Sequence, residues 1–297
     1  MATAFCPAHI TGFFKAELDK KDSKQLGSLG AGFSIQKGVK TTVTIRNKTK
    51  HDISNFTIKV NGFESGDMRV SEVVLSKFPT KEKFVDVIHE IDVPVGYGFG
   101  SSAAVALSLA IALNDALECK LSKIKVAQIA HDVEIECKTG LGDVLASYYG
   151  GFEIRDKPGA PGIGHVQKIT LDKISIIMIC FSPISTSKFI KEKLSQINGL
   201  GGKMVNELLE SKNYEHFQEM SLEFAKYVNV MTPRMQKVVN QLSKNNIKCG
   251  IALFGETIFS MVPKEKENNV LEILEKFSDG IIIKSKLDDT GARILYN

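Results

Sequence analysis

The stretch 94–114, PVGYGFGSSAAVALSLAIALN, constrains the fold more than any other part of the chain. Its run 103–113 contains no glycine, no proline and no charge, which predicts a helix that is buried on all sides. Ser101 and Ser102 precede this run, and serine is among the preferred N-cap residues. We therefore expect a central helix that begins at these two serines.

Three glycines occupy alternate positions in the loop before this helix, at Gly96, Gly98 and Gly100. Glycine adopts positive φ at little cost, so such a loop can bring its backbone N–H groups close to a ligand. A helix N-terminus adds unpaired N–H groups and a partial positive charge, and the combination favours phosphate. No Lys or Arg lies within 94–114, so we expect backbone and helix dipole alone to hold the anion. A turn that only packs a strand against a helix is the alternative, and the spacing is neither the P-loop nor the dinucleotide-binding motif.

Composition excludes several classes of protein. With 297 residues, 43% of them hydrophobic, the chain can bury a large core and is long enough for two domains. The net charge of +4 is spread among mixed acidic and basic residues, so we expect neither nucleic acid nor membrane as a partner. The five cysteines lack zinc or redox spacing. No signal peptide and no apolar run of about 20 residues occurs, which predicts a soluble cytoplasmic protein.

Periodicity predicts strands and helices in both halves of the chain. In the first half we expect helices at 69–78, 101–118 and 122–137, and strands at 2–6, 31–36, 40–46, 56–60, 84–92 and 152–155, with a turn at Gly38. The segment 156–165, DKPGAPGIGH, is rich in Pro and Gly and predicts a boundary between domains 1–165 and 166–297. The second half combines strands at 166–169, 174–181 and 280–287 with helices within 187–245, a hairpin within 249–262 and a helix at 267–277. This alternation is typical of an α+β sandwich.

Residues 94–104, PVGYGFGSSAA, closely resemble the P-x-G-x-G-L-G-S-S-A-A motif of the GHMP kinase superfamily, and only Phe99 departs from it. Residues 5–14, FCPAHITGFF, resemble the N-terminal element of that superfamily, with His9 in place of a common lysine. The third, glycine-rich element has a partial counterpart at 249–257, CGIALFGET. The resemblance implies a two-domain α+β GHMP kinase fold. Its N-terminal domain is ribosomal protein S5 domain 2-like and binds ATP, and its C-terminal domain is a ferredoxin-like α/β sandwich.

Within the superfamily the chain most resembles the archaeal pantoate kinases, through CPAHITGFF, GSLGAG at 27–32 and KTGLGDVLASYYGGFEIR at 138–155. This resemblance implies a homodimeric kinase that uses ATP and Mg²⁺ to phosphorylate pantoate to 4-phosphopantoate, on the archaeal route to coenzyme A. Three alternatives stay open. The first is another kinase of the superfamily, which acts on mevalonate, phosphomevalonate or homoserine. The second is a non-catalytic metabolite sensor on the same fold, and the third is a decarboxylase of the diphosphomevalonate type.

Phosphoryl transfer needs phosphate positioning, a divalent metal and a group that orients or deprotonates the attacking hydroxyl. Asp143, after the turn 139–142, is the candidate for that group, and the alternative is an N-cap of the next helix. The resemblance implies that Glu134 and Ser102 hold Mg²⁺, with Ser101 as a further candidate, while a solvated helical glutamate is the alternative for Glu134. The expected nucleotide-binding residues are Pro94, Gly96, Gly98, Gly100, Ser101, Ser102 and Ala103.

Pantoate carries a carboxylate and two hydroxyl groups, so its site needs a cation and hydrogen-bond partners. Arg155 is the candidate for the carboxylate, because a guanidinium pairs with both oxygens, and the alternative is a surface arginine. His131 lies three residues before Glu134 and shares its helix face, so it either binds a substrate oxygen or is an ordinary satisfied polar residue. Ser28, in the GSLGAG turn, either donates to the substrate or serves the turn. His9 either binds the substrate or packs.

Overall fold

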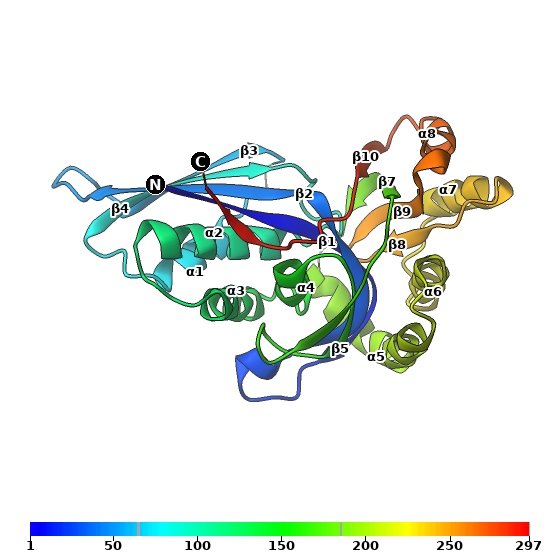
Figure 1. Cartoon of the computed structure of the whole chain (residues 1–297), viewed down its shortest axis with the longest axis horizontal. Helices are drawn as coiled ribbons and strands as arrows, with labels where there is room; N and C mark the ends of the chain where they lie inside the picture. Colours follow the sequence, from blue (N-terminus) through cyan, green and yellow to red (C-terminus); the bar gives the residue numbers. More distant parts are fainter. Residues whose placement is uncertain (64–65, 185, 297) are drawn as a thin grey trace.

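The computed structural model describes residues 1–63, 66–184 and 186–296, and these residues form two β-sheets with their helices (Figure 1). The first sheet contains β1 (Ala2–Glu17), β2 (Gly27–Asn47), β3 (Phe56–Gly62), β4 (Lys83–Ile91), β5 (Phe152–Lys157), β6 (His165–Ile169) and β11 (Arg293–Leu295). Between its strands lie η1 (Ser23–Gln25), α1 (Arg69–Ser76), α2 (Ser101–Ala116), α3 (Lys123–Cys137) and α4 (Asp143–Tyr149). The strand order is β11-β1-β2-β4-β3, and β5 pairs with both β2 and β6.

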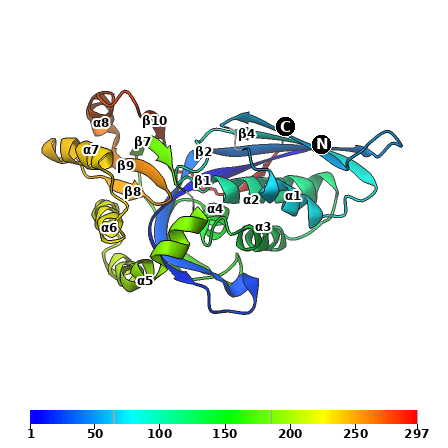
Figure 2. The same cartoon turned by 180° about the vertical axis from the view of Figure 1, so that it is seen from behind.

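β1 and β2 form one long hairpin whose β-bulges allow it to bend, as both views show (Figure 1, Figure 2). The expected turn at Gly38 was wrong, because Gly38 lies inside β2, opposite Pro7. A Cβ at this position would lie 2.2 Å from the carbonyl oxygen of Cys6, so the glycine permits close approach of two strands. The strands expected at 31–36 and 40–46 are therefore parts of one strand.

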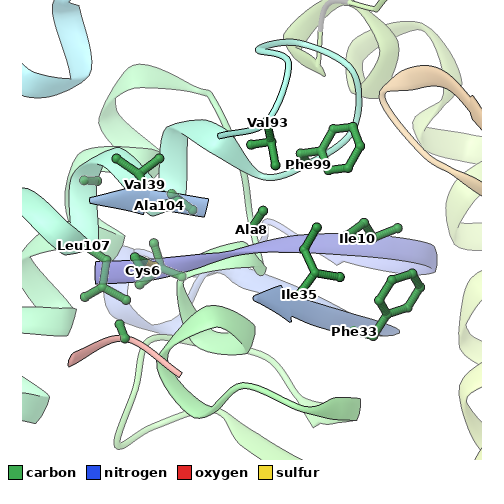
Figure 3. Packing of buried hydrophobic residues seen from close by; sticks show 14 of the residues in the cluster. Cys6, Ala8, Ile10, Phe33, Ile35, Val39, Val93, Phe99, Ala104 and Leu107 are labelled. Atoms are coloured by element: carbon green, nitrogen blue, oxygen red, sulfur yellow. The ribbon is translucent and has the colours of Figure 1, made fainter. Parts of the chain in front are cut away.

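The central helix is confirmed as α2, which packs against β1 and β2. The expected serine N-cap was wrong, because Gly100 is the N-cap residue and Ser101 and Ser102 are the first two helical residues. Phe99 lies in the core beside Val93 (Figure 3) and is 1% exposed. Burial of such a side chain contributes about 2 kcal/mol, so Phe99 anchors the glycine loop to the sheet.

The second sheet has the order β10-β7-β9-β8 and consists of β7 (Ile174–Pro183), β8 (Gly250–Ala252), β9 (Gly255–Pro263) and β10 (Ile281–Ser285). The helices of this half are α5 (Thr186–Ser211), which packs on β1, β2 and β5 of the first sheet, and α6 (Tyr214–Tyr227), α7 (Pro233–Lys244) and α8 (Glu267–Leu274), which pack on the second sheet; η2 (Lys264–Lys266) precedes α8. Read along the chain, this is the βαββαβ pattern of a ferredoxin-like fold, as expected. The hairpin expected within 249–262 is confirmed as β8 and β9.

The two halves share one core. Phe217 of α6 packs on Phe13, Phe33 and Phe152 of the first sheet and on Phe259 of the second, with ring centroids 5.0–6.2 Å apart. Aromatic pairs at such distances add packing energy beyond their buried area. The two sheets are therefore fixed to each other by a continuous apolar cluster.

The division of the sheets differs from the predicted boundary after residue 165. β6 pairs with β5, and β11 pairs with β1, so both strands belong to the first sheet. The segment 156–165 packs on the first sheet's own loops, where the N–H of Ala160 donates to the carbonyl of Lys24 at 2.8 Å. Within the described ranges, none of the helices has the length and apolar character needed to cross a membrane.

Candidate active site

A cavity of about 520 Å³ lies where β3 and β4 end and where α1 and α2 begin. β3 and β4 are parallel, so their carboxyl ends meet at the same edge of the sheet. The glycine loop forms one wall, and its glycines have φ values of 84°, 87° and 55°, which confirms the expected positive φ at Gly96, Gly98 and Gly100. Ser101 and Ser102 also line this nucleotide-sized cavity, whereas Pro94 and Ala103 are buried behind it.

The glycine loop is held from both halves of the molecule. The N–H of His9 donates to the carbonyl of Phe99 at 3.1 Å, and the N–H of Ile184 donates to the carbonyl of Gly96 at 2.9 Å. The hydroxyl of Thr257 donates to the carbonyl of Tyr97 at 2.8 Å. The loop conformation is therefore fixed before any ligand arrives, which spares a ligand the cost of ordering it.

The partial third motif provides part of this support. Its turn residue Phe254 has φ of 68°, an uncommon conformation for a bulky residue. The N–H of Leu253 donates to the carbonyl of Thr11 at 3.1 Å, so the turn is tied to β1. A Cβ at Gly255 would lie 2.0 Å from the carbonyl oxygen of Tyr97, so this glycine allows the hairpin to touch the loop.

Cations reach the cavity from outside the 94–114 segment. Arg69 at the start of α1 and Lys138 after α3 both line it. The expectation that backbone and dipole alone would hold an anion was therefore too narrow, because it considered only the residues nearest in sequence.

Asp143 sits directly under the glycine loop, since a Cβ on Gly100 would lie 3.3 Å from its Cβ. It is the first residue of α4, and the N-cap position belongs to Gly142. Its Oδ1 lies 2.8 Å from Nδ1 of His9 and accepts from the hydroxyl of Thr11 at 3.5 Å. The carboxylate is thus aimed at the β1 strand, into a set of donors.

His9 lies between two carboxylates. Its Nε2 is 2.9 Å from Oε1 of Glu153, while its Nδ1 faces Asp143. Ionised carboxylates only accept hydrogen bonds, so both ring nitrogens must carry protons and the ring is an imidazolium. Glu153 also accepts from Arg155 at 2.5 Å, which gives a network of two cations and two anions, in which His9, Glu153 and Arg155 are buried and Asp143 is partly buried.

The charges of this network shift the pKa values of its members. Burial alone would lower the pKa of His9, but its hydrogen bonds to Asp143 and Glu153 raise the value above that of a free histidine. Burial alone would raise the pKa of Asp143, but the hydrogen bond and charge of His9 and the charge of Arg155 lower it. Asp143 is therefore ionised at neutral pH.

Glu134 is buried at the same end of the cavity, behind Ser102, whose hydroxyl donates to Oε1 at 3.0 Å. Burial and the nearby charge of Asp143 raise the pKa of Glu134 to about 8. Its Oε2 has no hydrogen-bond partner among the side chains and backbone of the described residues. The solvated glutamate considered from the sequence is therefore excluded, since the side chain is 1% exposed.

Ser28 and Arg155 lie on the other side of Asp143. Ser28 lines a second, narrow pocket together with Thr11, Asp143 and Phe254, three residues that also line the larger cavity. A Cβ on Gly142 would lie 2.3 Å from Oγ of Ser28 and 2.9 Å from Nε of Arg155, so both side chains converge at this glycine. Arg155 is 1% exposed, and its Nε has no hydrogen-bond partner in the described part of the chain.

His131 lines neither cavity. It is buried in α3, and its Nε2 lies 3.2 Å from the carbonyl oxygen of Ser23 in η1. The structure thus brings His9, Ser28, Ser102, Glu134, Asp143 and Arg155 together and leaves His131 as support for the segment that leads into Ser28.

Sequence reasoning missed Thr11, Glu153 and Phe254. Thr11 and Glu153 lie two residues from His9 and Arg155, and side chains two apart share a strand face, so this spacing could have revealed them. No pattern in the sequence indicated that the tip of a distant hairpin would place Phe254 over both cavities.

Comparison with known proteins relates the chain to one superfamily. Residues 68–151 match the family described as "GHMP kinases N terminal domain". A solved structure described as "Phosphotransferase related to CoA biosynthesis pathway" superposes with a TM-score of 0.88 at 27% identity, covering 98% of this chain and 97% of the other.

Curated relatives narrow this relationship. A pantoate kinase of Thermococcus kodakarensis is 29% identical over 275 residues, 91% of each chain. A pantoate kinase of Methanocaldococcus jannaschii is 34% identical over 277 residues, which cover 91% of this chain and 96% of the relative. The shared fold, the glycine loop before α2 and this similarity along almost the whole length agree: the chain belongs to the pantoate kinase family of GHMP kinases.

Proposed function

We propose that this protein transfers the γ-phosphoryl group of ATP to the 4-hydroxyl of pantoate and so makes 4-phosphopantoate for coenzyme A biosynthesis. The observation that carries the proposal is the position of Asp143 at the end of the nucleotide-sized cavity, next to the place where Ser28 and Arg155 converge. A kinase needs its acceptor-orienting carboxylate at the junction of donor and acceptor sites. The names of the relatives in the family support pantoate as the acceptor.

ATP occupies the larger cavity in this proposal, with its phosphates against the glycine loop and the start of α2. Unpaired N–H groups and the helix dipole favour the phosphates there, and Lys138 adds positive charge. The loop is already fixed by backbone hydrogen bonds, so these groups act without reorganisation.

Ser102 and Glu134 fit a Mg²⁺ ion. Both offer oxygen, and the buried Oε2 of Glu134 lacks a hydrogen-bond partner among the described residues. No group of three or more His, Cys, Asp or Glu suited to a metal occurs in the described ranges, which matches an ion that takes most ligands from phosphates and water. When bound, Mg²⁺ would neutralise charge on the phosphates, and at neutral pH Glu134 would give up its proton on binding it.

Asp143 orients the 4-hydroxyl and accepts its proton as the new oxygen–phosphorus bond forms and the bond to the leaving ADP breaks. Because His9 and Arg155 lower the pKa of Asp143, we assign it chiefly to orientation, with late proton transfer. His9 takes the place of the common lysine of this superfamily by acting as a buried cation that fixes the carboxylate.

Pantoate lies beside Asp143 in this proposal, at the end of the larger cavity that faces Ser28, because the narrow pocket of about 10 Å³ is no larger than one water molecule. The hydroxyl of Ser28 and the unpaired Nε–H of Arg155 would receive its polar groups, and the buried positive charge of Arg155 favours a carboxylate there. His131 acts on this site indirectly, by holding the Ser23 end of the segment that carries Ser28.

A substrate panel tests the proposal. ADP release is followed with pantoate, mevalonate, phosphomevalonate and homoserine, and the product is identified by mass and NMR. We expect turnover with pantoate and a phosphate on its 4-oxygen. Turnover with another acceptor, and none with pantoate, would assign the chain a different reaction. The homodimer stays a prediction, which sedimentation analysis would test.

A further inference from the structure

A chain of hydrogen-bonded side chains reaches the larger cavity from the core, and the proposed mechanism does not use it. Ser71 Oγ lies 3.0 Å from His89 Nε2, and His89 Nδ1 lies 2.8 Å from Thr41 Oγ1. Thr41 Oγ1 lies 2.6 Å from Ser108 Oγ, which lies 2.7 Å from the carbonyl oxygen of Ala104. All four side chains are buried, and Ser71 and His89 also line the cavity. We name this set the Ser71 relay.

The direction of every proton in the Ser71 relay follows from its inner end. A carbonyl oxygen only accepts, so the hydroxyl of Ser108 donates to Ala104. The single proton of Ser108 is then used, and Thr41 must donate to Ser108. By the same argument the Nδ1–H of His89 donates to Thr41.

The outer end of the Ser71 relay is fixed as a consequence. Burial lowers the pKa of His89 to about 4, so the ring is neutral at pH 7 and its Nε2 carries no proton. Ser71 must therefore donate its own proton to Nε2. Only the lone pairs of its oxygen are left for a ligand, so the relay makes Ser71 a hydrogen-bond acceptor toward the cavity.

The walls around Ser71 suit a nucleobase rather than phosphate. Val60, Val70 and Ile91 give this part of the cavity an apolar lining, as expected for a planar ring. The start of α1 is already engaged by a carboxylate, since Oδ1 of Asp67 accepts from the N–H of Arg69. A second anion is disfavoured there, whereas the start of α2 carries the glycine loop.

We infer that the Ser71 relay selects the nucleobase of the phosphoryl donor, by accepting a hydrogen bond from an exocyclic amino group such as that of adenine. This inference rests on the proposed kinase function. A 6-oxo purine would place an oxygen against the oxygen of Ser71, and neither could donate. The loss of one buried hydrogen bond and the unpaired acceptor correspond to about 10- to 100-fold in affinity.

Three purine nucleotides test the inference: ATP, purine riboside triphosphate, which has no 6-substituent, and ITP, which has a 6-oxo group. Kd is measured by titration calorimetry, and kcat/KM is measured with saturating pantoate. We expect ATP to be preferred over ITP by at least about tenfold, with purine riboside triphosphate between them. Equal affinities for ATP and ITP would overturn the inference.

A substitution away from the cavity tests whether the Ser71 relay, rather than the general shape of the cavity, sets the preference for ATP over ITP. In Thr41→Val the Nδ1–H of His89 loses its acceptor, so the ring can move its proton to Nε2. Ser71 then accepts from His89 and can donate to a 6-oxo group. The ATP-to-ITP preference should fall about tenfold toward unity. Ser71→Ala should also remove the preference, through weaker ATP binding.

Thr42→Val is the matched control, because its hydroxyl bonds Thr3 rather than His89 or Ser108. It should keep the wild-type ATP-to-ITP ratio. An unchanged ratio in Thr41→Val, or an equal change in Thr42→Val, would overturn the inference. Should pantoate fail with every donor, the proposed function is wrong, and the Kd values for the three nucleotides still decide the inference.

Discussion

Asp143 and Glu134 are two carboxyl groups at the same end of the larger cavity, the first partly buried and the second fully buried, and their surroundings give them different charge states. Asp143 faces the imidazolium of His9 and the guanidinium of Arg155, which keep its pKa low. Glu134 has one serine hydroxyl and a like charge nearby, and its pKa rises to about 8. Side chains of the same type therefore take different tasks because of their partners, as in other sites with paired carboxylates.

The two carboxyl groups also differ in whether the protein alone balances their charge. The charges around Asp143 balance within the protein, whereas Glu134 stays protonated until a cation arrives. In the proposed function, the carboxylate of Asp143 is thus ready to orient the hydroxyl in the free protein, and Glu134 would become charged only when metal and nucleotide bind. Substitutions of the two carboxylates and of their neighbours test this contrast.

Asp143→Asn should cause the largest loss, about 10³-fold in kcat, because it removes the group that orients the attacking hydroxyl. The Kd for ATP should stay within about twofold, since the glycine loop is held by its own backbone contacts. Single-turnover kinetics and calorimetry measure the two quantities. Near-normal kcat would show that Asp143 takes no part in the reaction.

Glu134→Gln should lower kcat/KM by about 10²-fold and raise the Mg²⁺ concentration needed for half-maximal rate, because a neutral amide is a weaker ligand. Titration of the rate with Mg²⁺ measures both effects. A variant with the same Mg²⁺ dependence as the wild type would remove Glu134 from the metal site and break the contrast with Asp143.

His9→Gln should lower kcat by about tenfold or more, because a buried cation beside Asp143 is lost. The pKa of Asp143 should then rise, so the acidic limb of the kcat profile should move to higher pH. His9→Lys retains a positive charge and should recover part of the rate and most of the pH profile. If His9→Gln and His9→Lys have the same kcat and the same pH profile, the positive charge of His9 does not determine the rate.

Gly140→Ala and Gly142→Ala form a matched pair, two positions apart, and neither glycine has positive φ. A Cβ at 140 would lie 2.5 Å from Oε1 of Glu134, and a Cβ at 142 would lie 2.3 Å from Oγ of Ser28. We expect the first to weaken Mg²⁺ and the second to raise KM for pantoate, each by about tenfold. If Gly140→Ala instead raised KM for pantoate and Gly142→Ala instead weakened Mg²⁺ binding, the assignment of Glu134 to the metal and of Ser28 to pantoate would be contradicted.

Stability should show the smallest effect, with opposite pH dependence for the two carboxylates. Glu134 keeps its proton in the folded protein up to about pH 8 and loses it near 4.5 when unfolded, so its contribution to stability is lost as pH rises between these values. The Tm of Glu134→Gln should therefore gain a few degrees relative to wild type over this window.

Asp143 should act in the other direction. Its folded pKa lies below the unfolded value of 3.8, so its contribution is present above that value and is lost as pH falls. Asp143→Asn should therefore be destabilised most at neutral pH and least in acid. Melting curves without nucleotide or Mg²⁺ measure both trends, and parallel pH dependence of the two variants would refute the contrast.

Local patterns in the sequence predicted much of the fold. The apolar run after Ser102 was enough for α2, because a helix without charge can only be buried. Gly38 was misread as a turn, since a glycine at a close approach of two strands has the same local signature as a glycine in a turn. The pairing of β11 with β1 joins residues nearly 300 positions apart, and no local pattern encodes such a contact.

The residues of the site could be predicted where a sequence motif or the resemblance covered them. Their protonation states could not be predicted, because these depend on side chains that approach only in the folded protein. Asp143, Glu134 and Ser102 could be singled out, and the structure brings them together. The charge of Asp143 depends on His9 of β1 and Arg155 of β5, which meet it only in the folded chain. His9 illustrates this best, because its protonation follows from two carboxylates 134 and 144 residues away.

The pairing of Arg293–Leu295 with Thr3–Phe5 has a consequence for biosynthesis. Residues 293–295 leave the ribosome nearly 300 residues after the segment of β1 with which they pair, so that edge of β1 stays open while the intervening chain is made. Such edges invite pairing with other chains, and nascent copies would be vulnerable to it until β11 has been made. The same proximity of the ends suits a circular permutant, in which a short linker would join the two strands and shorten that delay.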